Sequence, residues 1–390
     1  MKKMQNSRRT AAFIIAKWIA TGDFPSNMLP ESGPDRSFVQ DLVYTALRRF
    51  RPLRKILGML LSRWPKGEME ALLYVGAAQI LYMEDVPDFA AVNETVEAAK
   101  ECANPNVAKV VNAVLRNLVR RREEMLAMLA SAPVEERESY PGALYRRWTG
   151  RYGQENAELL AKWHNMPAET YLAYPDRFEK LPRGKRVGDA EGYAEGRFVV
   201  QDPATALAVE LLDVRPGDKV FDMCAAPGGK TIQIAWRGAE VTACEIKPSR
   251  RRRLAENLER VGLAGKVAVV PSPDSLADGS FPKILVDAPC SNTGVLRRRP
   301  DARWNWSEEK LTALVKLQAE ILDRAAAICA PGGIVVYSTC SNEPEENMET
   351  VEAFLSRHAD FELVRSRESV PYETGHDGAF AAKLLRKNQS

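Results

Sequence analysis

The chain has 390 residues, of which 45% are hydrophobic and 27% are charged, and its net charge is +3 at pH 7. This length is too great for one ordinary hydrophobic core, so we expect a globular protein of two domains, or two and a small insert. The six cysteines contain no Cys-x-x-Cys pair and the three histidines have no ligand spacing, which argues against a structural zinc site.

The first ten residues are polar and basic, and the apolar stretch that follows at 11–20 is short and interrupted by Lys17. Neither a signal peptide nor a membrane span fits this pattern. We therefore expect a cytoplasmic protein with reduced thiols, without a membrane or a metal as partner.

Hydrophobic residues recur at helical spacing from residue 8 to about residue 122, which predicts an all-α domain over residues 1–130. These 130 residues hold 19 Lys and Arg against 14 Asp and Glu. A basic excess favours a polyanion such as RNA as partner, and an ordinary solvated helical surface is the alternative. The candidate RNA-binding residues, which face away from the apolar stripe of one helix, are Lys109, Asn112, Arg116, Arg120 and Arg121.

Residues 131–197 lose this pattern and are expected to form a linker and a small accessory subdomain with one helix at 148–163. Residues 198–390 then alternate short apolar strands with helices, which predicts an α/β domain with a doubly wound, mostly parallel, Rossmann-like sheet. The expected strands are 219–223, 239–245, 267–270, 283–288 and 334–338, with helices at 248–261 and 308–330.

A turn of small residues follows the first expected strand and leads into a helix. In a doubly wound sheet this is the nucleotide-binding position, because free amide groups at the helix start attract an anionic group. A phosphate loop would need glycine where Cys224 stands, and the Gly-x-Gly-x-x-Gly of dinucleotide sites is missing, so we expect S-adenosylmethionine. The turn consists of Asp222, Cys224, Ala225, Ala226, Pro227, Gly228, Gly229 and Lys230.

An acid, Glu245, closes the next strand about twenty residues after this turn, where it is expected to hydrogen-bond a ribose diol. The alternative is an exposed acid paired with the arginine run at 250–253. Lys230 is expected to face either the cofactor carboxylate or the substrate.

Two cysteines lie where two further strands end, Cys290 in Asp-Ala-Pro-Cys and Cys340 in Ser-Thr-Cys-Ser. Strand carboxyl ends face the ligand crevice of such sheets, so this pair predicts thiol chemistry beside the cofactor. A single cysteine more often packs as a small hydrophobic residue, which is the alternative and is the role expected for Cys102, Cys244 and Cys329.

A basic and aromatic segment follows Cys290 closely. We expect its arginines to grip phosphates and its tryptophan to stack on a neighbouring base. The alternative is a tryptophan in the core beneath solvated arginines. The residues concerned are Arg297, Arg298, Arg299 and Trp304.

Three motifs, at 222–231, 287–291 and 338–341, together resemble those of the Sun-type RNA (cytosine-5) methyltransferases. The segments 35–44 and 107–118 are similar to the NusB-type RNA-binding domain. Fused in this order, the two parts resemble the RsmB/Sun-type family of bacterial ribosomal RNA (cytosine-5) methyltransferases over nearly the whole chain. One departure is Asn292, which stands where the family more often has Gly or Ala.

The resemblance implies methyl transfer from S-adenosylmethionine to carbon 5 of a cytosine in RNA, foremost small-subunit ribosomal RNA, through a covalent cysteine adduct at carbon 6. It gives Cys340 the role of nucleophile and Cys290 a part in releasing the product. Asp287 would contact ring nitrogen 3 and the amino group of cytosine as well as the cofactor, and Asp274 would hold the adenine amino group.

Two alternatives stay open. One is a non-catalytic RNA-binding or ribosome-assembly factor, although such a platform has no need of both thiols. The other is the same chemistry on transfer RNA or DNA. We expect the protein to act as a monomer.

Overall fold

The computed structural model describes residues 6–30, 33, 35–102 and 105–388. Residue contacts divide the chain into two compact units, of which the first comprises Met1–Asn165 and Arg299–Asn305 and the second Met166–Arg298 and Trp306–Ser390. The segment 131–197, expected to form an accessory subdomain, is therefore divided between the two units after Asn165.

The first unit is all helical, as the hydrophobic spacing predicted. Its helices are α1 (Ser7–Thr21), α2 (Arg36–Arg48), α3 (Phe50–Leu60), α4 (Glu68–Tyr82), α5 (Asp88–Cys102), α6 (Pro105–Arg120), α7 (Arg122–Ala130), α8 (Val134–Arg137), α9 (Gly142–Asn165) and α13 (Ala302–Asn305), with a 3₁₀ turn η1 (Pro25–Asn27).

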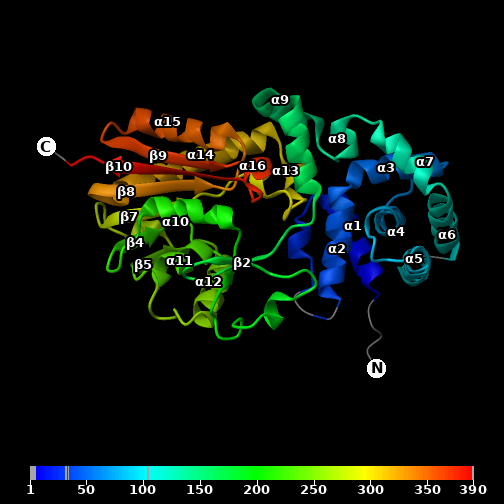
Figure 1. The fold of residues 1–390 in the computed structure, drawn as a ribbon, viewed down its shortest axis with the longest axis horizontal. Helices are drawn as coiled ribbons and strands as arrows, with labels where there is room; N and C mark the ends of the chain where they lie inside the picture. The colour runs from blue at the N-terminus through cyan, green and yellow to red at the C-terminus, as the bar shows by residue number, and fades with distance from the viewer. Residues whose placement is uncertain (1–5, 31–32, 34, 103–104, 389–390) are drawn as a thin grey trace. The chain divides into compact units, whose positions relative to one another are not determined.

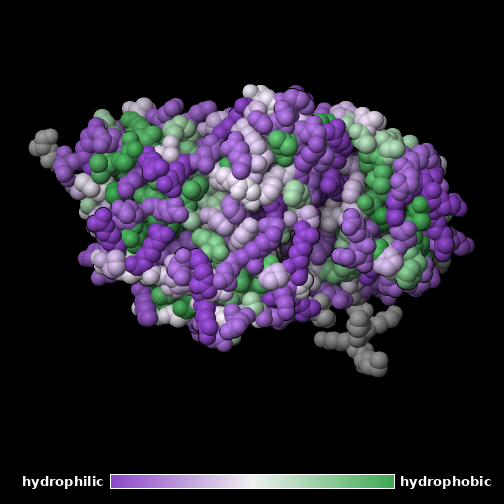
Figure 2. Space-filling model, viewed as in Figure 1, coloured by the Kyte–Doolittle hydropathy of each residue, from purple (hydrophilic) through white to green (hydrophobic). Residues whose placement is uncertain are grey.

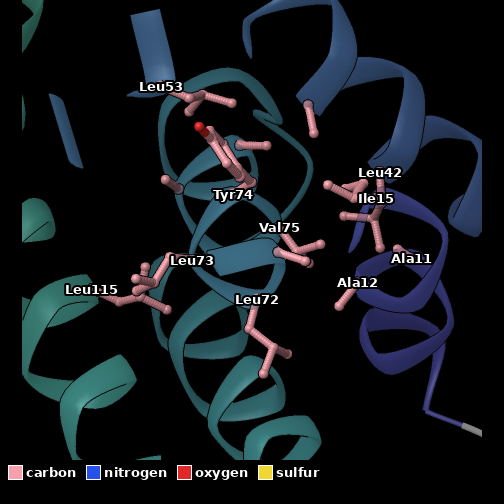
Figure 3. Packing of buried hydrophobic residues seen from close by; sticks show 14 of the residues in the cluster. Ala11, Ala12, Ile15, Leu42, Leu53, Leu72, Leu73, Tyr74, Val75 and Leu115 are labelled. Atoms are coloured by element: carbon pink, nitrogen blue, oxygen red, sulfur yellow. The ribbon is translucent and has the colours of Figure 1, made fainter. Parts of the chain in front are cut away.

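Helix α4 forms the centre of this unit. Its residues from Glu70 to Ile80 are all buried, as expected for a helix that is apolar on every side. Figure 3 shows Leu73 pointing toward Leu115 of α6, while Val75 points toward Ile15 of α1 and Leu42 of α2. The other helices therefore each bury one apolar stripe against α4 or its neighbours.

The second unit contains a seven-stranded sheet in the order β6-β5-β4-β7-β8-β10-β9. Strands β4 to β8 are parallel and β10 runs antiparallel to both β8 and β9, which confirms the mostly parallel, doubly wound sheet. The strands are β4 (Lys219–Asp222), β5 (Glu240–Cys244), β6 (Ala268–Val270), β7 (Phe281–Asp287), β8 (Cys329–Thr339), β9 (Phe361–Ser369) and β10 (Ala379–Arg386).

Helices cover both faces of this sheet. Helices α10 (Ala206–Leu212), α11 (Gly229–Trp236) and α12 (Pro248–Arg260) lie on one face, and α14 (Glu308–Ile328) and α15 (Met348–Arg357) lie on the other (Figure 1). Neighbouring residues of a strand therefore point into different hydrophobic cores. Val220 packs against the face covered by α10, α11 and α12, and Phe221 packs against the face covered by α14 and α15. The surface over α12 is largely hydrophilic (Figure 2).

A second, small antiparallel sheet precedes the large one. It consists of β1 (Tyr171–Ala173), β2 (Phe178–Lys180) and β3 (Val199–Val200), with Leu172, Leu181 and Phe198 as its core. The remaining short elements are η2 (Val187–Asp189), η3 (Pro203–Thr205), η4 (Pro273–Ser275), η5 (Thr293–Val295), η6 (Pro344–Glu346) and α16 (Pro371–Thr374). Across the described residues, no helix combines the length and hydropathy of a membrane-spanning segment.

Candidate active site

The three motifs meet at the carboxyl edge of the large sheet. Asp222 ends β4 and Asp287 ends β7, and Asp287 pairs in register with Ser338 of β8. Because these strands are parallel, the loops that follow them emerge at the same edge. The turn at 222–230 and both cysteine loops therefore surround one site.

The two cysteines predicted for the site lie next to each other. The Sγ atoms of Cys290 and Cys340 are 3.3 Å apart, and both residues are half-buried and free of a disulfide. The amide of Gly294 donates to the carbonyl of Cys340 at 3.0 Å, and the Asn292 side chain donates to the carbonyl of Cys290 at 2.8 Å. Asn292 has a φ of 61°, a left-handed conformation that asparagine tolerates better than most residues.

Hydrogen bonding and burial affect the Cys290 thiol strongly. The hydrogen bond with Cys340 and, next, burial raise the pKa of Cys290 well above its usual value. A thiol with a raised pKa stays protonated at neutral pH and can donate a hydrogen bond to a neighbouring thiolate.

A charged network lies beside the thiols. Lys230 Nζ is 2.6 Å from one oxygen of Asp287, and Ser338 Oγ donates to the other at 2.9 Å. Burial lowers the pKa of Lys230, but attraction to Asp287 and their hydrogen bond outweigh it, so the pKa of Lys230 is raised on balance. Lys230 and Cys340 also line one small cavity, together with Asp377 and Phe380. A positive charge thus faces the space next to the Cys340 sulfur.

The turn after β4 has the geometry of a nucleoside-binding turn. Gly228 has a φ of 109°, and a Cβ there would lie 2.8 Å from a methyl carbon of Leu254. Only glycine accommodates both the positive φ and the close approach of Leu254 without strain. Because it has no side chain, it also leaves the amide groups before α11 accessible. At the end of β5, Glu245 is 6% exposed and accepts a hydrogen bond from the Lys247 amide at 2.8 Å. These residues fit S-adenosylmethionine.

Asp222 lies beneath this turn and is 1% exposed. One of its oxygens accepts from Thr231 Oγ at 2.6 Å, and the other has no hydrogen-bond partner among the described residues. Burial, opposed by the Thr231 hydrogen bond, raises the pKa of Asp222 to about 6. A buried carboxylate oxygen left without a donor fits a site that is completed by a polar ligand.

Asp274 follows β6 at the same edge of the sheet. Its side chain is 82% exposed, and its carboxylate accepts from Ser272 Oγ at 2.9 Å. Contact with an adenine amino group is thus sterically open and stays a prediction.

Comparison with known proteins agrees with this geometry. A family model described as 16S rRNA methyltransferase RsmB/F matches residues 209–385, and the NusB family model matches residues 5–120. Ribosomal RNA small subunit methyltransferase B of Serratia proteamaculans is 34% identical over 432 residues, covering 99% of this chain and 100% of that protein. The protein of the same name from Vibrio vulnificus is also 34% identical and covers 98% of this chain. The chain belongs to the RsmB/F family of 16S rRNA methyltransferases.

As a member of the RsmB/F family, the protein is an S-adenosylmethionine-dependent RNA (cytosine-5) methyltransferase with a NusB domain at its start. The crystal structure of PH0851 has the same fold, with a TM-score of 0.77, and covers 98% of this chain and all of that one at 21% identity. Family membership confirms the expected enzyme class and cofactor and argues against the alternative of a non-catalytic assembly factor.

Two of the three arginines after Cys290 bind protein groups in the structure. Arg297 is 3% exposed and donates to the carbonyl of Pro167, and Arg298 forms ion pairs with Asp202 and Asp377. Because their guanidinium groups already bind protein acceptors, we revise their predicted role from RNA contact to support of the site. Arg299 is half-buried, with its guanidinium 5.9 Å from the Phe24 ring centroid.

The base-stacking role predicted for Trp304 is also revised. Its ring packs edge-on against Phe50 at a centroid distance of 5.5 Å, and its Nε1 donates to the Leu47 carbonyl at 2.9 Å. The neighbouring Arg303 is fully buried, with its guanidinium 4.2 Å from the Tyr140 ring centroid. The segment 299–305 therefore belongs to the helical unit, and Trp304 packs against its core as in the alternative interpretation, but Arg303 is buried rather than solvated.

The predicted basic residues of α6 lie on its outer side. Lys109, Arg116 and Arg120 are exposed, whereas Arg121 is half-buried and forms an ion pair with Glu124 at 2.6 Å. The structure thus leaves the first three available to a polyanion. Of the cysteines expected to be structural, Cys244 and Cys329 are buried, and the side chain of Cys102 lies outside the described residues.

Sequence reasoning did not identify the polar residues that support the two cysteine loops. Ser291 and Ser341 each follow a cysteine, and both donate to the carboxylate of Glu346. The only sequence signal was the acidic run at 343–346 shortly after Cys340, which also fits an exposed turn.

Proposed function

We propose that the substrate is a cytosine in small-subunit ribosomal RNA, that Cys340 attacks its carbon 6, and that Cys290 assists release of the product. The observation that carries this proposal is the 3.3 Å separation of the two sulfur atoms beside the Lys230–Asp287 pair. The family match and the names of the relatives support ribosomal RNA as substrate over transfer RNA or DNA.

Carbon 5 of cytosine is a poor nucleophile until a group adds at carbon 6. The Cys340 thiolate forms the carbon–sulfur bond to carbon 6, and the electrons of the 5,6 double bond shift through carbon 4 to ring nitrogen 3. Nitrogen 3 takes up a proton from water, which it returns when the product forms, so the adduct is a neutral enamine. Lys230 stabilises negative charge on the attacking sulfur, and the Asp287 carboxylate accepts hydrogen bonds from the amino group and from the protonated nitrogen 3. The cytosine has to be unstacked or flipped to reach this site.

When bound, S-adenosylmethionine supplies the methyl group that becomes attached to carbon 5. A base then removes the carbon-5 proton, the double bond re-forms, and the bond to Cys340 breaks. The Cys290 thiol, held protonated 3.3 Å away, donates a hydrogen bond to the departing thiolate and so favours release. The residues proposed to hold the cofactor are Asp222, Cys224, Ala225, Ala226, Pro227, Gly228, Gly229, Lys230, Glu245, Asp274 and Asp287.

The helical unit is proposed to hold the RNA through the outer side of α6. Phosphates would be bound by Lys109, Arg116 and Arg120. Arg121 would bind a phosphate in place of its present ion-pair partner, Glu124. The match of residues 5–120 to the NusB family supports this assignment.

Two assays test the proposal. Tritiated-methyl transfer from S-adenosylmethionine should label unmodified 16S rRNA, with bisulfite sequencing locating the cytosine, and transfer RNA and DNA should stay unlabelled. Denaturing gels should then show no protein–RNA adduct with Cys340→Ala and an accumulating adduct with Cys290→Ala. Labelling of transfer RNA alone would reject ribosomal RNA as the substrate. An adduct with Cys340→Ala but not with Cys290→Ala would show that Cys290 is the nucleophile and Cys340 the residue that assists release.

A further inference from the structure

A buried carboxylate, Glu346, connects the two cysteine loops. It is fully buried, and one of its oxygens accepts from the Ser291 amide at 2.8 Å and from Gln318 Nε2 at 3.1 Å. Its other oxygen accepts from the hydroxyl groups of Ser291 and Ser341, which are 3.1 Å from each other. Ser291 follows Cys290 and Ser341 follows Cys340, so one carboxylate binds the residue next to each catalytic sulfur.

The Cys340 loop has anchors of its own. Thr339 Oγ donates to the Asn347 side chain at 2.6 Å, and Asn347 donates back to the Ser341 carbonyl at 2.9 Å. The Gly294 amide holds the Cys340 carbonyl at 3.0 Å. These contacts do not involve Glu346, so we expect Cys340 to keep its position when Glu346 is replaced.

The Cys290 loop depends on Glu346 more directly. The Ser291 amide and hydroxyl both donate to this carboxylate, and Gln318 binds both Glu346 and the Pro289 carbonyl at 2.9 Å. Loss of the carboxylate would remove the acceptor of the Ser291 amide and one of the two acceptors of Gln318 Nε2, and leaving a buried donor unpaired is unfavourable. The loop would relieve this cost by shifting, and the sulfur of Cys290 would move with it.

We propose that Glu346 is a positioning residue that holds the Cys290 thiol against the Cys340 sulfur for product release. This inference rests on the roles proposed above for the two cysteines. The Glu346 carboxylate binds Ser291, Ser341 and Gln318 rather than either sulfur, and it acts on Cys290 through Ser291. Its replacement should therefore slow release more than attack, because Cys340 and the Lys230–Asp287 pair are held by other contacts.

A bifunctional bromobimane tests the sulfur geometry independently of catalysis, because it becomes fluorescent once it has alkylated two neighbouring thiols. Wild-type protein should give this signal, and Cys290→Ala and Cys340→Ala define the background. We expect Glu346→Ala to lower the rate of bridging at least tenfold. Glu346→Gln, which keeps one acceptor oxygen, should restore much of it. The matched control is Glu349→Ala, an exposed acid three residues later, which should behave as wild type.

The same variants are then compared on denaturing gels after reaction with RNA and S-adenosylmethionine. Glu346→Ala should accumulate a methylated protein–RNA adduct, as expected for Cys290→Ala, with at least a tenfold lower kcat and an unchanged Kd for the cofactor. If Glu346→Ala does not fold, as judged by cofactor binding, Ser291→Ala is used in its place, because it removes the hydroxyl donor next to Cys290 and leaves the Ser341 contacts intact.

Wild-type bridging and turnover in Glu346→Ala, or in Ser291→Ala where that variant replaces it, would overturn the inference. So would loss of turnover without adduct while Cys290→Ala does trap one, because attack would then have failed. If Cys290→Ala itself traps no adduct, the proposed cysteine roles fail, while slower bimane bridging in Glu346→Ala still establishes the positioning of the two sulfurs.

Discussion

Lys230 and Asp287 form an ion pair at 2.6 Å between the cofactor turn and the first cysteine loop. The Lys230 side chain is 15% exposed and that of Asp287 is 35% exposed, so neither charge is fully screened by solvent. The pair joins the turn that receives the cofactor to the loop that carries Cys290. The ion pair thereby fixes the Asp287 carboxylate, which is proposed to bind nitrogen 3 of the cytosine.

Replacing Asp287 with asparagine should reduce kcat for methyl transfer about 100-fold, because the carboxylate that favours proton uptake at nitrogen 3 is replaced by a neutral amide. Asparagine keeps the size of the side chain, so cofactor affinity measured by calorimetry should change only a few-fold. The readout is tritiated-methyl transfer to unmodified 16S rRNA under saturating cofactor. Activity within a few-fold of wild type would show that Asp287 serves the fold alone.

The raised pKa of Asp222 predicts a specific pH dependence of stability. Its ordinary value of 3.8 becomes about 6 in the folded protein because of burial, so folding favours the protonated acid. The stabilisation from this group is complete below pH 3.8 and is lost as the pH rises through 6, which amounts to about 3 kcal/mol. The Asp222→Asn side chain cannot ionise. The free energy of unfolding of this variant, relative to wild type, should therefore increase by about 3 kcal/mol between pH 4 and pH 7.

Urea unfolding of both proteins at several pH values provides the measurement. Other titrating groups are common to both proteins and cancel in the difference. A difference in unfolding free energy that stays constant from pH 4 to pH 7 would mean that Asp222 ionises normally in the folded state.

Trp304 is partly buried against the helical core, which predicts a loss of stability on its removal. Trp304→Ala should lower the free energy of unfolding by about 3 kcal/mol, because the ring packs against Phe50 and Trp18 of the helical core. Trp304→Phe should cost less, since it keeps part of the aromatic contact. Thermal unfolding followed by circular dichroism checks both variants. A Trp304→Ala protein of wild-type stability with weakened RNA binding would restore the base-stacking interpretation.

The exposed cations of α6 predict the salt dependence of RNA binding. Each phosphate contact contributes about 0.7–0.9 to the slope of log K against log salt concentration. Replacing Lys109, Arg116 and Arg120 together with alanine should therefore reduce this slope by about 2 in a filter-binding titration. Replacing three exposed cations of α12, Arg250, Arg252 and Arg253, is the matched control and should leave the slope nearly unchanged. Equal changes in both variants would indicate a nonspecific charge effect.

The parallel part of the sheet was predictable because each of its strands is a short apolar run followed by a helix. All five expected strands overlap β4 to β8, and helices 248–261 and 308–330 overlap α12 and α14. Strands β9 and β10 were not predicted. β9 is an edge strand and most of its residues are exposed, so hydrophobic burial leaves little pattern in its sequence.

The small antiparallel sheet was not predicted from the sequence, for a different reason. Its strands β1 to β3 have only two or three residues each, which is too short for an alternating pattern to be recognised. The helix expected at 148–163 lies within α9, but the assignment of that helix to the first unit depends on tertiary contacts.

Within the site, residues at strand ends were predictable because topology brings parallel strand ends together. Cys290, Cys340 and Asp287 are of this kind. The roles of Arg297, Arg298 and Trp304 were not predictable, because a basic and aromatic segment has the same composition whether it faces RNA or protein. The acceptors that bind these arginines are distant in the sequence: Asp377 and Asp202 lie 79 and 96 positions from Arg298, and Pro167 lies 130 positions from Arg297.

The proposed mechanism depends most on which sulfur forms the bond to the cytosine. The most direct measurement is mass spectrometry of the adduct that Cys290→Ala is expected to accumulate with S-adenosylmethionine and unmodified 16S rRNA, after digestion of protein and RNA. We predict that the peptide containing Cys340 carries a methylated cytidine nucleotide. A nucleotide on any other peptide, or unmodified Cys340 in a protein that still methylates RNA, would contradict the proposed mechanism.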